Sequence, residues 1–126
     1  MDKFGLESAK KIGATDYDFS RDGGAAGEIA LSPAYSVPKG AIVTGGYIKV
    51  DTAVTSGDAA TIAVHLENAE DVLEETAIAS FSAGALIPIV TTAFVTANHG
   101  GFKVTIGTAA LTGGAFTIFA EYIETR

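Results

Sequence analysis

The fold is decided by residues 41–67, AIVTGGYIKVDTAVTSGDAATIAVHLE. Residues 41–54 predict a long β-strand, in which simple alternation puts Ile42, Ile48 and Val50 on one face and Val43, Tyr47 and Lys49 on the other. A glycine pair at 45–46 interrupts the alternation, which predicts a bulge or a bend in this strand. Turn residues follow at 55–58, and the bulky apolar side chains of residues 61–67 all share one face. The stretch therefore predicts two half-buried strands joined by a turn.

The flanking sequence continues this pattern of short strands and turns. Residues 15–20 and 28–31 predict two strands joined as a hairpin through an Asp-Gly-Gly turn. A proline within residues 86–90 predicts an edge strand or an irregular crossing rather than a central strand, and residues 102–106 alternate again. About eight short strands without a long helical pattern predict an all-β protein, an antiparallel β-sandwich of the jelly-roll kind.

The last predicted strand, residues 116–124, is apolar on both faces. Phe116 and Ile118 share one face, whereas Phe119 and Ile123 lie on the other. A strand buried on both sides is either central in its sheet or part of a contact between subunits. Phe119 and Ile123 are therefore candidate oligomer-contact residues.

The N-terminal residues 1–14 differ from the rest of the chain. The first eleven residues contain three of the eight basic residues, and apolar side chains are interspersed among them. We predict an extended N-terminal arm at 1–14 and a single β-sandwich domain at 15–126. The candidate binding residues of the arm are Phe4, Leu6, Lys10, Lys11 and Ile12. The alternative is an ordinary frayed terminus.

Length and composition exclude several classes of protein. A chain of 126 residues fits one domain, and its net charge of −7 argues against a nucleic-acid binder, which needs a basic surface. The absence of Cys excludes thiol catalysis, thiolate zinc sites and a disulfide scaffold. No apolar stretch is typical of a signal peptide or a membrane helix, so we expect no membrane partner.

Residues able to carry chemistry are few. His65 is expected on a solvated strand face, and His99 is expected in a polar turn. Asp16 and Asp18 share a strand face but lack the remainder of a calcium-loop pattern. The acidic segment 67–75 is expected to be a solvated loop or one helical turn capped by Asn68, and metal binding there stays open. We expect no catalytic residues, no cofactor and no metal site.

Two segments carry a resemblance. TDYDFSRDGGAAGEIAL (15–31) and VPKGAIVTGGYIKVDTAVTSGDAATIAVHLENAEDVL (37–73) resemble the capsid decoration, or cement, proteins of tailed bacteriophages. The similar features are an aromatic strand before an Asp-Gly-Gly turn, the PKGAIVTG start of a long strand, and a TSGDAATIAV hairpin before a short acidic segment.

The resemblance implies a jelly-roll-like sandwich that binds the outside of an assembled capsid and stabilises the shell. It also implies a homotrimer at three-fold positions, with the major capsid protein as partner and a terminal arm that reaches neighbouring subunits. Neither catalysis nor a cofactor is implied. The protein would be made in the host cytoplasm and would reside on the virion exterior.

Two alternatives stay open. The first is a head or tail-fibre module that recognises a host-surface glycan. The second is an enzyme, which would require His65 or His99 to lie in a pocket with carboxylates.

Overall fold

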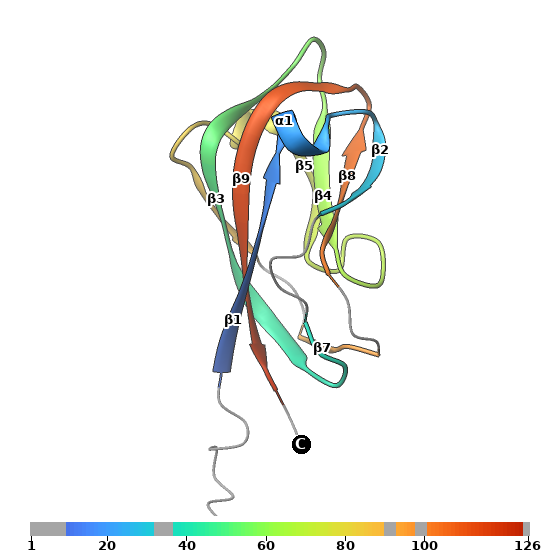
Figure 1. The fold of residues 1–126 in the computed structure, drawn as a ribbon, viewed down its shortest axis with the longest axis vertical. Helices are drawn as coiled ribbons and strands as arrows, with labels where there is room; N and C mark the ends of the chain where they lie inside the picture. The colour runs from blue at the N-terminus through green and yellow to red at the C-terminus, as the bar shows by residue number, and fades with distance from the viewer. Residues whose placement is uncertain (1–9, 32–36, 90–92, 98–100, 125–126) are drawn as a thin grey trace, which may run out of the picture.

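The computed structural model describes residues 10–31, 37–89, 93–97 and 101–124 (Figure 1). The strands are β1 (Lys10–Asp18), β2 (Gly27–Ala30), β3 (Ile42–Ser56), β4 (Thr61–His65), β5 (Leu73–Ala77), β6 (Leu86–Ile89), β7 (Phe94–Val95), β8 (Lys103–Gly107) and β9 (Leu111–Ile123). The helical elements of this part of the chain are single turns, α1 (Phe19–Asp22) and η2 (Ile78–Ser80).

The strands form two antiparallel sheets that pack as a sandwich (Figure 1). The first sheet has the order β1-β9-β3-β6, with β7 also paired to β3, and the second has the order β2-β8-β4-β5. Four strand pairs are nested along the chain: β4 pairs with β5, β3 with β6, β2 with β8 and β1 with β9. From the innermost pair to the outermost, they lie alternately in the second and the first sheet. This is the connectivity of a jelly roll, in which a folded ribbon of paired strands wraps around one core. The predicted all-β sandwich is confirmed.

The core lies between the inner faces of the two sheets. Tyr17 of β1 stacks on Phe116 of β9 with ring centroids 5.1 Å apart, and Phe81 packs against the same Phe116 at 5.4 Å. Ile62 and Val104 close the core from the second sheet, and all of these side chains are buried. Such aromatic burial supplies a large share of the hydrophobic stabilisation of a small sandwich.

The predicted irregularity at the glycine pair of β3 is confirmed, and it has a consequence for the strand's faces. The register against β9 shifts between Val43 and Gly45. As a result Val43 and Ile48 both face the core, whereas Ile42 faces outward opposite Ile123. Simple alternation placed Ile42 and Ile48 on one face, and this part of the prediction is wrong because a bulge reverses the side-chain parity.

The predicted hairpin between the first two strands is wrong. β1 pairs with β9 in one sheet, and β2 pairs with β8 in the other. The chain turns between the sheets through α1, where the Asp18 carboxylate accepts the Ser20 amide N–H at 2.9 Å as an N-cap. The turn is also held from the core, since the Tyr17 hydroxyl donates to the Gly23 carbonyl at 2.5 Å.

The turn at 55–58 likewise joins two sheets, so β3 and β4 do not form the expected hairpin. By contrast, β6 with Pro88 lies at the edge of the first sheet, as the proline predicts. β9 lies centrally between β1 and β3, which is one of the two roles expected for a strand that is apolar on both faces.

Candidate functional site

The outer face of the first sheet is unusually apolar. Among the described residues, the large hydrophobic side chains that stay exposed are Ile12, Tyr47, Leu86 and Val95. The registers of β1, β3, β6 and β7 against their neighbours place all four on the outward side of this sheet. Exposed apolar surface of this kind is a candidate contact surface for another molecule.

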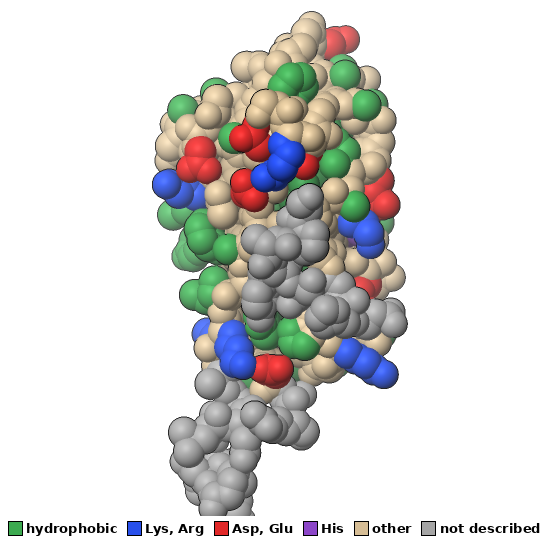
Figure 2. Space-filling model, viewed as in Figure 1, with side chains coloured by type: hydrophobic (Ala, Val, Ile, Leu, Met, Phe, Trp, Pro, Cys, Tyr) green, Lys and Arg blue, Asp and Glu red, His purple; other side chains and the backbone are tan. Residues whose placement is uncertain are grey.

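The strand register aligns apolar residues in a row across the whole sheet. Ala14 of β1 lies opposite Phe119 of β9, which lies opposite Tyr47 of β3, which in turn lies opposite Pro88 of β6. We name as the apolar face this row together with the outward apolar residues around it: Ile12, Ala14, Ile42, Tyr47, Leu86, Pro88, Val95, Phe119 and Ile123. In Figure 2 hydrophobic side chains gather along the left side of the molecule, where Figure 1 draws β3.

Charged side chains that lie beside the apolar face, on the same side of the sheet, form ion pairs. Lys10 Nζ lies 3.7 Å from a Glu121 carboxylate oxygen, and Lys49 Nζ lies 3.5 Å from one of Asp51. The same Asp51 carboxylate accepts the Thr117 hydroxyl at 3.2 Å. These exposed pairs contribute little to folding stability. The remaining outward acids of β1 are Asp16, which lies 3.4 Å from the Arg21 guanidinium, and Asp18.

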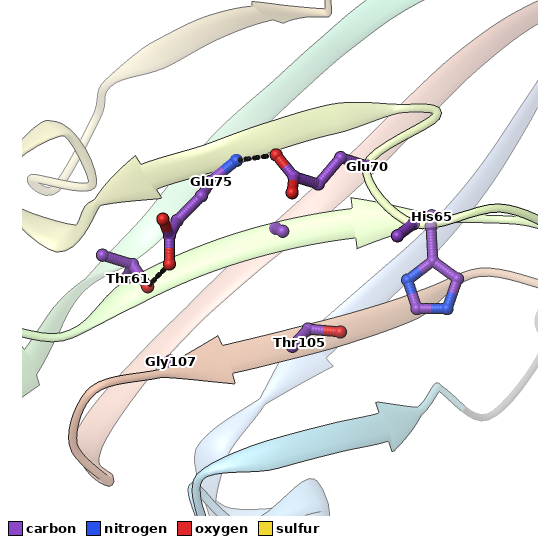
Figure 3. Close-up of a pocket in the computed structure, with 8 residues that line it drawn as sticks. Thr61, His65, Glu70, Glu75, Thr105 and Gly107 are labelled. Atoms are coloured by element: carbon purple, nitrogen blue, oxygen red, sulfur yellow. Dashed lines mark hydrogen bonds between the residues drawn. The ribbon is translucent and has the colours of Figure 1, made fainter.

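The outer face of the second sheet has the opposite character. It presents Glu28 on β2, Thr105 on β8 and Thr61 on β4, and five acids occur in residues 67–75 beside it. A shallow pocket opens here, and its polar lining comes mainly from Thr61, His65, Glu70, Glu75 and Thr105 (Figure 3).

The environment of His65 differs from the prediction of a solvated strand face. His65 does lie on the outward side of β4, but it is only 8% exposed rather than solvated. Its Nε2 lies 2.9 Å from a carboxylate oxygen of Glu28, and residues 69 and 70 lie beside it in the pocket. Strand parity alone does not predict this burial, because the neighbours of His65 come from β2 and from the loop that follows β4.

The carboxylates of the pocket are engaged within the protein. Glu70 Oε1 accepts the Glu75 amide N–H at 3.0 Å, and Glu75 Oε2 accepts the Thr61 hydroxyl at 2.9 Å (Figure 3). Within the part of the chain that the structure describes, no group of three His, Asp or Glu side chains is arranged to hold a metal ion. The pocket therefore offers hydrogen-bonding groups that tie the loop and β5 to β4.

Other acids singled out in the sequence also serve the backbone. The Asp71 carboxylate accepts the amide N–H groups of Leu66, Glu67 and Asn68 at 2.8–3.0 Å, so Asp71 and not Asn68 orders the acidic segment. Hydrogen bonds from the Ser20 side chain and backbone lower the pKa of Asp18. His99, the second candidate for chemistry, lies outside the described residues.

The arm residues divide into two groups. Phe4 and Leu6 lie outside the described residues, whereas Lys10, Lys11 and Ile12 belong to β1. Residues 10–14 are therefore part of the sandwich, and the predicted arm boundary at 14 is too late because β1 pairs with β9 from Lys10 onward. The ammonium groups of Lys10 and Lys11 pair with Glu121 and Glu124 of the same chain.

The candidate oligomer-contact residues Phe119 and Ile123 are both half-buried on the outward side of β9. The structure places them on the same outward side as Tyr47, Leu86 and Val95, which were not among the residues predicted for this contact. Alternation did put Tyr47 and Lys49 on a shared face, but a single strand does not show which of its faces is turned to solvent.

Comparison with known proteins informs the fold. No protein-family model and no curated protein sequence matches the chain. A chain of a solved structure described as the cyanophage Pam1 capsid asymmetric unit superposes with a TM-score of 0.71 at 18% identity, covering 98% of this chain and 90% of that chain. A chain of the acidic stable capsid structure of Helicobacter pylori bacteriophage KHP30 gives 0.64 at 13% identity, covering 94% and 90%. The likeness shows a shared fold.

Among the described residues, no helix is long and apolar enough to cross a membrane.

Proposed function

We propose that this protein is a structural component of a bacteriophage capsid that binds the outside of the assembled shell and stabilises it. The observation that carries the proposal is the likeness to chains of two phage capsid structures, which extends over nearly the whole of this chain. Because both neighbours are also covered to 90%, the shared fold is the complete sandwich and not a common fragment. No catalytic step and no cofactor belong to the proposal.

The finer features of the proposal are a cement role, a trimer at three-fold positions and the major capsid protein as partner. A cement protein acts by burying surface against several subunits at once. The location would be the virion exterior, after synthesis in the host cytoplasm. The N-terminal residues, with Phe4 and Leu6 as apolar anchors, are the proposed capsid-binding segment.

The experiment uses capsids of the encoding phage that lack this protein. The full chain is added, the capsids are sedimented, and the bound fraction and the temperature of genome release are measured. We expect saturable binding and release at a higher temperature. Failure to sediment with the capsids, or binding without any change in heat resistance, would contradict the cement role.

A truncation tests the capsid-binding segment. Removing residues 1–9 leaves β1 complete from Lys10, so the sandwich retains its β1·β9 pairing. The truncated protein should melt at the same temperature as the full chain and bind capsids at least about tenfold more weakly, a loss of roughly 1.4 kcal/mol. Unchanged capsid affinity would show that the segment is not the docking element.

A further inference from the structure

The apolar face is a candidate contact surface, and the distribution of charge over the chain favours one kind of occupant. The whole chain carries a net charge of −7, so two copies repel each other over most of their surfaces. Six of the fifteen acids, namely Glu28 and the five in residues 67–75, lie on the side of the second sheet, whose outward residues also include Lys103. The apolar face lies on the opposite sheet, and its two lysines are already paired with acids there.

Two like-charged copies therefore meet with the least repulsion through the apolar face. Such a contact also leaves the acidic segments of the two copies on their far sides. A strongly basic partner would instead be attracted to the second sheet and the 67–75 segment. The distribution of charge thus favours a second copy of this chain as the occupant of the apolar face.

The size of the face fits such a contact. The strands β1, β9 and β3 run side by side over about 30 Å and the shorter β6 over about 13 Å, so at about 4.8 Å per strand the outward side of this sheet presents roughly 500 Å² in flat projection. Specific protein contacts bury about 800 Å² on each partner on average, with weaker ones at roughly 600 Å². An area of this size fits a weak association between copies, in which monomers and oligomers exchange with protein concentration.

We infer that the apolar face is the contact surface between copies of this protein, with Tyr47 and Phe119 at its centre. These two residues face each other across β3 and β9 in the middle of the row. Large aromatic side chains at the centre of a contact contribute most of its binding energy. The inference rests on the proposed function only for the number of copies, since a capsid trimer would bring three such faces around one axis.

Sedimentation equilibrium on the full chain tests this inference. We expect the wild-type chain to associate at roughly 10–100 μM, and Tyr47→Glu or Leu86→Glu to weaken association at least about tenfold, because each places a charge in the apolar contact. The matched control is Ala30→Glu, which adds the same charge at an exposed position on the outer side of the second sheet. It should associate like the wild type, and thermal melting shows that all variants are folded.

The absence of cysteine allows an independent measurement. Lys49→Cys places a single thiol on the outward side of β3, next to the row, for a nitroxide label, and Thr105→Cys places one on the second sheet. Electron-electron distances between copies should be shorter and better defined for the label at 49. A longer distance at 49 than at 105 would overturn the inference.

Other outcomes separate this inference from the proposed function. A wild-type chain that stays monomeric at about 1 mM, or equal effects of Tyr47→Glu and Ala30→Glu, overturns the self-contact. A monomer whose binding to capsids is lost on Tyr47→Glu also overturns it and assigns the apolar face to the capsid. Association through the face without any capsid binding supports the self-contact and contradicts the capsid role.

Discussion

The glycine pair of β3 gives the sharpest test of how the sandwich is built. Gly46 has φ 144°, a conformation that side chains with a Cβ rarely adopt. A Cβ added there would lie 1.9 Å from the carbonyl oxygen of Phe119 on the central strand β9, where real contacts stay beyond about 3 Å. Gly46→Ala therefore strains the backbone and also pushes the two central strands apart.

The expected loss can be estimated from these two causes. Strain at such a φ costs roughly 1–3 kcal/mol, and each ladder hydrogen bond weakened by separating β3 from β9 costs about 1 kcal/mol. We expect Gly46→Ala to lower the free energy of unfolding by about 3–5 kcal/mol. With an unfolding entropy of about 2.1 cal/mol/K per residue, this lowers the Tm by about 10–20 °C.

Two matched variants separate the causes. Gly27 has φ 123° with nothing within 4 Å of an added Cβ, so Gly27→Ala reports the strain alone and should cost about 1–3 kcal/mol. Gly57 has open space and no positive φ, so Gly57→Ala should change stability by less than about 0.5 kcal/mol. The chain has no Trp, so unfolding in urea is followed by far-UV circular dichroism. Equal losses for the variants at 46 and 27 would refute the argument from the close contact.

Three further predictions concern single side chains. Burial raises the pKa of the Tyr17 hydroxyl from 10.0 to about 12. As pH rises, the unfolded chain therefore loses this proton before the folded chain does, and the free energy of unfolding should fall between about pH 10 and pH 12. Tyr17→Phe should remove this part of the pH dependence when unfolding is measured in urea. Asp71→Ala leaves three backbone N–H groups without their carboxylate and should cost about 2–3 kcal/mol in urea unfolding, whereas the exposed neighbour Glu74→Ala should cost less than about 0.5 kcal/mol; equal costs would contradict the ordering role of Asp71. A double-mutant cycle of His65→Ala and Glu28→Gln should give a coupling of about 0.5–1 kcal/mol by urea unfolding, and a coupling of zero would show that their 2.9 Å contact is not energetically significant.

Local sequence patterns predicted many of the elements but not their partners. The Asp-Gly-Gly sequence correctly placed a turn after β1, yet the strands on either side belong to different sheets. Hairpin pairing competes with pairing to distant strands, and here the one-turn helix capped by Asp18 redirects the chain across the sandwich. The burial of Tyr17 against Phe116, 99 positions away along the chain, favours the distant pairing.

For the apolar face too, local sequence indicated some of the residues, whereas their arrangement depends on the pairing of distant strands. A strand that is apolar on both faces was expected to be either central in its sheet or part of a contact between subunits, with Phe119 and Ile123 as the candidate contact residues. The row that joins Phe119 to Ala14, Tyr47 and Pro88 depends on the register of four strands, which no single strand encodes. Likewise, His65 was correctly placed outward, but its burial involves neighbours from β2 and from the loop after β4.

The sequence by itself determined an all-β chain, the approximate positions of its strands, the irregularity at 45–46 and the edge position of the strand with Pro88. These features follow from side-chain period, glycine and proline, which act within a few residues. Only the tertiary structure decided which strands pair, which face of β3 is buried and where the uncovered apolar residues gather. Those outcomes depend on contacts between residues far apart in the chain, where burial of one face in the shared core leaves the other face exposed.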